Sequence, residues 1–182
     1  MQPIYSKDGT LDVINSQHIL EDGLDYDNFA KADISCWDTQ ARARVFKDDI
    51  LIYTTGANIG RTAIYLNDKQ AIASNHVNIL RLNVSNKLYA AFVLNSLVGR
   101  LQTEKLSAGS AQQELYPKDI EQFYIPFVDN ACQTRIAEKI RQSFTLRAQS
   151  QHLLALAQRA VETAIEHSEP KAMELLQKGA IP

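Results

Sequence analysis

The feature that most constrains the fold of this chain is a run of 36 residues, 131–166, without a glycine or a proline. A continuous helix of that length would measure about 54 Å, because each helical residue advances the chain by 1.5 Å. Its second half has apolar and small residues near the heptad spacing, at Leu146, Leu153, Ala157, Ala160 and Ala164. The part of the chain that precedes it is too small to cover so long a helix. The sequence therefore predicts that the helix pairs with another helix, and a second copy of the chain is the simplest source of one.

Two arrangements of this segment agree with the sequence. In the first, residues 131–166 join two chains as an antiparallel homodimer, in which the alanines let the helix backbones approach closely. In the second, the segment folds back on itself as two shorter helices. Pro170 ends the helix in either case, and residues 171–178 could form one more short amphipathic stretch.

Residues 1–128 show a different pattern, in which short runs of β-forming residues alternate with turns. Residues 88–105 have helical spacing, and Pro117 marks a helix start or a turn. The expected strands are 49–55, 61–66, 71–73, 76–82 and 123–126. The sequence thus predicts an α+β fold. A strand-rich globular domain over 1–128 is followed by a long helix over 129–168 that pairs as an antiparallel coiled coil, and by a short tail over 169–182.

The composition is that of a soluble globular protein, with 45% apolar and 22% charged residues. No apolar run approaches the roughly 18 residues needed to cross a membrane, and the N-terminus lacks the pattern of a signal peptide. Cys36 and Cys132 lie far apart and neither belongs to a CxxC motif, so neither a disulfide framework nor a zinc site is expected. The sequence predicts a cytoplasmic protein.

The motifs of common catalytic and cofactor sites are missing from the sequence. It contains no P-loop ending, GxGxxG spacing, HExxH or nucleophile elbow. It also lacks the Asn-Pro-Pro-Tyr type of run that amino-methyltransferases use. Asp48 and Asp49 directly precede an expected strand, where they look like turn residues. We therefore expect no catalytic residue, no cofactor and no metal.

The distribution of charge leaves room for an acidic ligand. The net charge of −2 weighs against nucleic-acid binding, yet residues 41–113 hold nine basic and only four acidic side chains. The same segment contains polar loops at 56–60, 74–76 and 107–113. A locally basic surface can bind phosphates on a slightly acidic protein, although ordinary surface scatter explains the charges equally well.

Three segments of the chain resemble motifs of the specificity subunits of type I restriction–modification systems. Residues 49–63, with the sequence DILIYTTGANIGRTA, are similar to a strand–loop–strand motif of that family. Residues 109–115, GSAQQEL, are similar to one of its loops, and Ile125-Pro126 followed by residues 133–137, QTRIA, to its transition into a conserved helix. Residues 7–9 and 16–19 also resemble its opening. The order and spacing agree across about residues 6–165.

Two departures from the family pattern matter for function. Members usually carry two recognition domains and two conserved helices, whereas this chain has one of each. It also lacks the Trp-led strand that commonly precedes the first motif. The chain could be a natural half-subunit, a truncated reading frame or an excised piece, and homodimerisation would restore the paired layout.

The resemblance implies that polar side chains of the loops contact double-stranded DNA. Asn and Gln can pair with adenine and Arg with guanine, while Lys and Ser can contact phosphates. The alternatives are a plain hairpin turn at 56–60, a hydrogen-bonded structural histidine at 76, a flexible linker at 107–113 and a solvated strand face for the arginines. The candidate DNA-binding residues are Arg42, Arg44, Thr55, Asn58, Arg61, Ser74, Asn75, His76, Lys105, Ser110, Gln112 and Gln113.

The expected function is sequence-specific DNA recognition by a subunit that is not itself catalytic. The resemblance implies a separate methyltransferase (M) subunit as partner, and a restriction (R) subunit in a larger assembly, with the long helix setting the dimer and docking these subunits. Two other classes stay open, namely a free-standing nuclease with an unrecognised site and a dimeric protein-interaction scaffold that never touches DNA.

Overall fold

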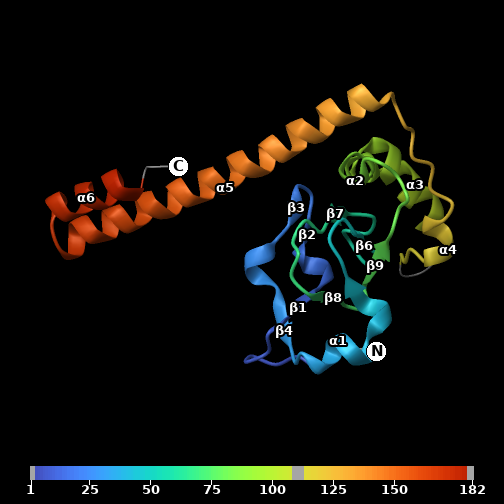
Figure 1. Ribbon diagram of the computed structural model, residues 1–182, viewed down its shortest axis with the longest axis horizontal. Helices are drawn as coiled ribbons and strands as arrows, with labels where there is room; N and C mark the ends of the chain where they lie inside the picture. Colours follow the sequence, from blue (N-terminus) through green and yellow to red (C-terminus); the bar gives the residue numbers. More distant parts are fainter. Residues whose placement is uncertain (1–2, 108–112, 180–182) are drawn as a thin grey trace. The chain divides into compact units, whose positions relative to one another are not determined.

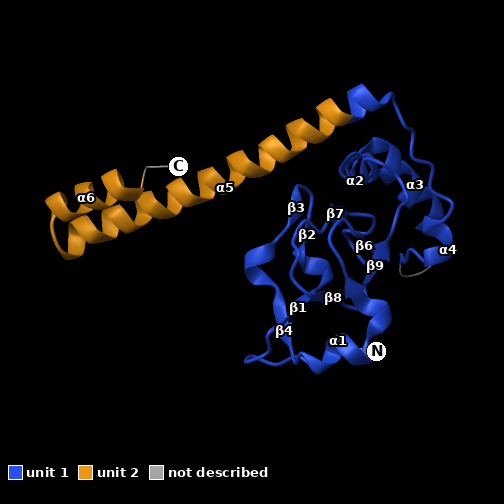
Figure 2. Ribbon diagram, viewed as in Figure 1, with its two compact units in different colours: residues 1–133 blue, residues 134–182 orange. Residues whose placement is uncertain are grey.

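The computed structural model describes residues 3–107 and 113–179. The chain forms two compact units, residues 1–133 and 134–182 (Figure 2). The predicted combination of a strand-rich part and a long C-terminal helix is confirmed (Figure 1).

The first unit contains two main sheets. The larger has the strand order β4 (Ala30–Ala32), β1 (Leu11–Ile14), β8 (Ala71–Ala73), β5 (Arg44–Val45), with β1 and β8 parallel and the other pairs antiparallel. The smaller is antiparallel, with β6 (Ile50–Tyr53) between β7 (Thr62–Ile64) and β9 (Val77–Leu80). A short hairpin, β2 (Ile19–Leu20) and β3 (Gly23–Leu24), completes the strands.

The predicted strands 49–55, 61–66, 71–73 and 76–82 correspond to β6, β7, β8 and β9. Ile50, Leu51 and Ile52 of β6 are all buried, which explains the continuous apolar run that marked this strand in the sequence. Leu51 pairs with Ala63 of β7 on one side and with Ile79 of β9 on the other. These strands share one core cluster of buried residues: Ile14, Ile19, Phe29, Val45, Leu51, Ala63, Tyr65, Ala71, Ala73 and Val77.

Short helical segments connect the strands of the larger sheet. They are η1 (Ser16–His18), η2 (Tyr26–Asn28), α1 (Ser35–Thr39) and η3 (Ala41–Ala43). Cys36 of α1 packs in a second core cluster with Leu11, Val13, Ala32 and Ile72. Residues 35–43 therefore pack on a buried apolar cluster before the chain enters β5. Residues 39–43 of this segment form one wall of the hollow described below.

The helix predicted over 88–105 is divided in two. α2 (Lys87–Asn95) begins at Asn86, whose side chain accepts a hydrogen bond from Tyr89 N, and it stops before Ser96, which has extended backbone angles. α3 (Leu97–Ser107) starts directly afterwards. Gly99 allows this tight corner, because a Cβ there would lie 1.8 Å from the carbonyl oxygen of Leu94.

The strand predicted over 123–126 is not a strand in the structure. Tyr124 N donates to Gln102 Oε1 at 2.6 Å, and Gln102 Nε2 donates to Tyr124 O at 3.0 Å. A side chain of α3 thus satisfies the backbone groups that a neighbouring strand would otherwise bind. Of the helix start or turn expected at Pro117, the structure has the helix start, in the short helix α4 (Pro117–Ile120).

The long helix, α5 (Asn130–Glu166), has 37 residues without interruption, so its sequence does not fold back as two shorter helices. Instead, the predicted amphipathic tail forms α6 (Glu169–Gly179), which includes Pro170 in its first turn. Within the second unit, α6 runs back beside α5, since Gly179 O lies 3.1 Å from His152 Nε2 (Figure 1). The structure contains a single chain, so pairing of α5 with a second copy stays a prediction.

Candidate nucleic-acid interface

Backbone hydrogen bonds bring the three polar loops of the sequence together at the end of β6. Thr54 N donates to His76 O at 3.1 Å, which joins the strand end to the 74–76 turn. Leu115 N donates to Thr54 O at 2.9 Å, and Gly56 N donates to Gln113 O at 3.4 Å. The segment after residue 112 is therefore fastened beside the 56–60 loop. We call this meeting point, formed by Thr55, His76 and Gln113, the loop junction.

Polar side chains of the loop junction face one another. His76 Nδ1 lies 3.3 Å from Thr55 Oγ1, across two segments that are 21 residues apart in the chain. His76 and Gln113 are exposed, and Thr55 is half-buried. Ser110 and Gln112, the other two candidates in the third loop, lie outside the described residues. The junction thus offers hydroxyl, imidazole and amide groups to an outside ligand on a backbone frame.

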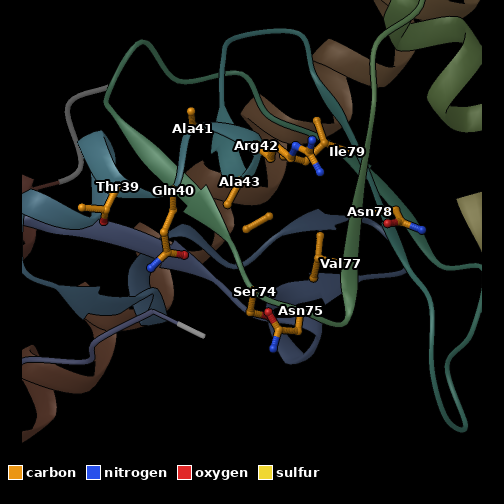
Figure 3. A pocket seen from close by; sticks show the side chains of 11 residues that line it. Thr39, Gln40, Ala41, Arg42, Ala43, Ser74, Asn75, Val77, Asn78 and Ile79 are labelled. Carbon is orange, nitrogen blue, oxygen red and sulfur yellow. The ribbon is translucent and has the colours of Figure 1, made fainter. Parts of the chain in front are cut away.

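A hollow of about 560 Å³ is lined by Ser74 and Asn75, which directly precede His76 of the loop junction in the chain (Figure 3). Residues 39–43, from the end of α1 through η3, form one wall, and β8, the 74–76 turn and β9 contribute the other. Three of the predicted contact residues, Arg42, Ser74 and Asn75, line it together with Asn78. The structure therefore joins Arg42 to the 74–76 turn, although more than 30 residues separate them in the sequence.

A second recess, of about 430 Å³, is lined by the 57–61 loop, Glu21, Asn95 and Arg100. We call it the arginine recess. Arg61 Nη2 lies 3.6 Å from Glu21 Oε1, and Arg100 adds a second guanidinium to the lining. The predicted contact Asn58 also belongs to the lining. Two guanidinium groups and an amide suit a phosphate or a base edge.

Residues of α2 and α3 hold the 56–60 loop in place. Asn95 Oδ1 accepts a hydrogen bond from Thr62 N at 2.8 Å, and its amide donates to Thr62 O. Gly60 has a φ of +82°, and a Cβ at that position would lie 2.4 Å from Thr103 Oγ1 of α3. Glycine is therefore required where the loop touches α3. Lys105, the remaining candidate in α3, is exposed two residues further along the helix.

Arg44 differs from Arg61 because its guanidinium has a hydrogen bond and a ring contact within the domain in addition to an ion pair. Arg44 Nε donates to Trp37 O at 2.7 Å, and the guanidinium carbon lies 4.9 Å from the centre of the Trp37 ring. Asp38 lies 3.6 Å from its Nη2. These contacts give Arg44 a structural role in fixing α1 against β5.

Asp48 and Asp49 have structural surroundings, as the sequence predicted for turn residues. Asp48 has a φ of +68°, and the buried Asp49 accepts hydrogen bonds from Phe46 N and from Arg81 Nε, both at 2.9 Å. Within residues 3–107 and 113–179, no three His, Cys, Asp or Glu side chains are grouped to hold a metal ion. None of the helices in those ranges is both long and apolar enough to span a bilayer.

The sequence did not single out Arg100, Asn95, Asn78 or Glu21. Their side chains join the site only because α2, α3, β9 and the β2–β3 hairpin approach the loops in three dimensions. Basic charge was the one signal present, since Arg100 belongs to the locally basic segment 41–113. No spacing rule in the sequence distinguishes it from the other cations.

The predicted dimerisation residues of α5 do not share one environment. Leu146 and Leu153 are 57% and 52% exposed, and Ala157 and Ala164 are exposed as well. Ala160, by contrast, is only 5% exposed within the single chain. It lies one helical turn from Leu156, which contacts α6 at Gly179.

Comparison with known proteins identifies the family. The family model of the type I restriction modification DNA specificity domain matches residues 4–154. No curated protein matches the sequence. The S subunit of a type I restriction–modification system from M. genitalium is similar in structure, with a TM-score of 0.53 and 18% identity, over 90% of this chain and 38% of that one.

A second solved structure, described as showing complex assembly and conformational transition of the type I R-M system, has a TM-score of 0.54 and 15% identity. The match covers 98% of this chain and 42% of that one. The chain therefore spans about two fifths of the length of these relatives, and the low identities support the fold alone. The family match over residues 4–154, together with the observed fold, shows that this chain belongs to the type I restriction–modification DNA specificity domain family.

Proposed function

We propose that this chain reads a DNA target sequence as a recognition subunit of a type I restriction–modification complex, and that it is not itself catalytic. The observation that carries the proposal is the meeting of the 56–60 loop, the 74–76 turn and Gln113 at the loop junction, in a chain of the DNA specificity family. Family membership supports DNA as the ligand, and the geometry supports the loop junction as the surface that would read it.

The two hollows beside the junction suit different parts of a DNA duplex. Arg61, Asn58 and the exposed amide of Gln113 are side chains of the types that read base edges. Arg42 and Lys105 are exposed cations that suit phosphate oxygens, which fix the position of a protein without reading sequence. Both kinds of contact are needed for specific binding.

The proposal includes partner subunits and a second copy of the chain. A separate methyltransferase subunit would supply the chemistry, with a restriction subunit in a larger assembly, and the complex would act on DNA in the cytoplasm. Pairing of two copies through α5 would place two recognition domains in one complex.

The proposal is tested on the chain assembled with its methyltransferase subunit. The target is first identified by sequencing the methylated bases, and binding to target and scrambled duplexes is then titrated at several salt concentrations. We expect Asn58→Ala and Arg61→Ala to cost about 1–3 kcal/mol of specific affinity each, since each removes a base-reading group. Gln112→Ala should behave in the same way on the sequence argument.

Lys105→Ala should weaken target and scrambled DNA alike, and it should lower the slope of log K against log salt by about one unit. Lys47→Ala is the matched control, because Lys47 is an exposed lysine whose Nζ already pairs with Asp68 at 2.8 Å. The four test substitutions are Asn58→Ala, Arg61→Ala, Gln112→Ala and Lys105→Ala. If all of them leave the affinities for target and scrambled DNA unchanged while the complex still assembles, DNA is read elsewhere on the domain or not at all.

A further inference from the structure

The second half of α5 has two apolar faces, and α6 covers one of them. Leu156 and Ala160 are 4% and 5% exposed, and Ala172 of α6 is equally buried. The backbone of Gly179 lies so close to Leu156 that a Cβ there would be 2.5 Å from Leu156 Cδ1. The end of α6 is also held by His152, whose Nε2 lies 3.1 Å from Gly179 O.

The other apolar face of the second half of α5 is left exposed by α6. It consists of a stripe of six positions, of which the four large residues are more than half exposed: Leu146 57%, Leu154 62%, Val161 60% and Ile165 80%. The stripe is completed by Ser150 and Ala157, which are exposed too. We call these six residues the open stripe. Large apolar side chains in such a row indicate a surface that another molecule covers.

We infer that α6 directs a second copy of the chain onto the open stripe, in one antiparallel register, by occupying the competing face around Leu156 and Ala160. This inference rests on the dimer of the proposed function and goes beyond it. It identifies which face of α5 is used, which residues meet, and what excludes the alternative pairing that the sequence predicted through Leu153, Ala160 and Ala164.

The spacing of the open stripe argues that its occupant is another α5. Its positions follow one another at intervals of four, four, three, four and four residues, the same in both directions. A two-fold axis between Leu154 and Ala157 therefore brings every stripe residue onto another stripe residue. Leu154 then meets the partner's Ala157, which places a large side chain against a small one on both sides of the axis.

The ends of the stripe and the charges of the helix support the same direction. Leu146 meets the partner's Ile165, so two large exposed side chains cover each other. Residues 130–147 contain four basic and one acidic side chain, whereas residues 158–174 contain four acidic and two basic ones. Antiparallel pairing brings these opposite charges together, and parallel pairing would bring like charges together.

The role of α6 follows from the position of Ala160. The spacing predicted from the sequence alternates steps of four and three residues along α5 and includes Leu153, Ala160 and Ala164. This spacing is also the same in both directions along the helix. Sequence alone therefore cannot choose between the two registers. With α6 in place Ala160 is buried, so a partner helix cannot reach it. In the open stripe, Leu153, Ala160 and Ala164 are each replaced by the residue that follows them in the chain, namely Leu154, Val161 and Ile165.

Disulfide trapping distinguishes the two registers with variants that differ by one position. In a Cys132→Ser background, the pair Ser150→Cys with Val161→Cys places the new thiols opposite each other across the open stripe. The matched control pairs Ser150→Cys with Ala160→Cys, which are opposite each other only in the alternative register. Since a disulfide needs its two Cβ atoms within about 4.5 Å, we expect the first pair to cross-link at least about tenfold faster than the second.

A substitution in α6 tests its directing role. Ala172→Asp places a charge in the buried contact with α5, which should release α6 and expose Ala160. In that background, the Ser150/Ala160 cysteine pair should gain cross-linking. If this pair cross-links as fast as the other with α6 intact, the inference is overturned while the dimer stands. If sedimentation shows the unmodified chain to be a monomer at tens of micromolar, the dimer itself is overturned, whereas DNA recognition is judged by the separate binding assay.

Discussion

His18 is a titratable side chain enclosed in the core of the first unit. It is 1% exposed, its ring lies 5.3 Å from that of Phe29, and its Nδ1 accepts a hydrogen bond from Asn15 N at 2.9 Å. Burial lowers the pKa of His18 below its ordinary value, and the nearby Asp25 opposes this shift only in part. The imidazole is therefore neutral at pH 7, and it supports the turn that leads into β2.

This burial predicts how stability depends on pH. The pKa of His18 is lower in the folded than in the unfolded chain, so the unfolded chain binds the proton more readily. The stabilising contribution is complete above the unfolded pKa of about 6.5, and it is lost as the pH falls from there towards the folded pKa. Urea unfolding at pH 7.5 and 5.5 should show a lower free energy of unfolding at the acidic pH.

The control is His18→Gln, which keeps a hydrogen-bond acceptor without a group that titrates in this range. Its free energy of unfolding should change less between the two pH values than that of the unmodified chain. His76 and His152 are exposed and remain in both proteins, so their contributions cancel. An equal pH dependence in the variant would assign the effect to other groups.

Among the elements, the corner between α2 and α3 matters most for the site. α2 supplies Asn95, which holds Thr62 beside the arginine recess, and α3 supplies Arg100 and Lys105. The two helices meet directly at Ser96, and Gly99 packs against the last carbonyls of α2. The positions of Asn95 and Arg100 in the arginine recess therefore depend on Gly99, which has no side chain.

We expect Gly99→Ala to destabilise the first unit by about 1–3 kcal/mol or more, because the added methyl group would overlap the Leu94 carbonyl and force the helices apart. Thermal unfolding of the purified chain measures this effect. Val98→Ala is the matched control, since Val98 is exposed on the same turn of α3 and should cost much less. Equal melting temperatures for Gly99→Ala and the unmodified chain would show that the corner can relax.

The strands and the long helix could be predicted from sequence, because each has a local signature. The apolar run at Ile50–Ile52 and the absence of glycine and proline from 131–166 depend on neighbouring residues only. The parallel pairing of β1 with β8 has no such signature, since it joins residues about sixty positions apart. The loop junction also depends on long-range bonds, such as those from Thr54 N to His76 O and from Leu115 N to Thr54 O, so the candidates were found in the sequence while their grouping was not.

The strand expected at 123–126 is wrong for a physical reason of the same kind. These residues have the composition of a strand, but Gln102 of α3 satisfies the backbone of Tyr124. A segment distant in sequence supplies the contact, and local pattern cannot show it. Ala160 fits the heptad spacing of a dimer seam and is 5% exposed within one chain, and its role in pairing stays a prediction.

At the scale of the whole molecule, a symmetric pair of identical chains restricts the DNA it can read. Two copies related by a two-fold axis present two identical loop junctions, so they contact two identical half-sites in opposite orientation. The proposed dimer therefore predicts that the methylated target is an interrupted palindrome. A full-length relative with two different recognition domains would have no such restriction.

Methylome sequencing of cells that express the chain with its methyltransferase subunit measures the target directly. A two-part motif whose halves are reverse complements, separated by a fixed gap, is the expected result. The same cells expressing Leu154→Glu, which places like charges near the two-fold axis of the open stripe, are the control and should lose the modification. An asymmetric target would show that the second half-site is read by a different protein.

The loop junction is fastened by main-chain atoms. The bonds from Thr54 to His76, from Leu115 to Thr54 and from Gly56 to Gln113 use only peptide N–H and C=O groups. Every amino acid except proline carries both groups, so the framework does not depend on which side chains the loops display. Random libraries at positions 55, 58, 75, 76 and 113 should therefore keep folding while their base preference drifts, and new specificities should arise from this domain by substitution alone, without redesign of its scaffold.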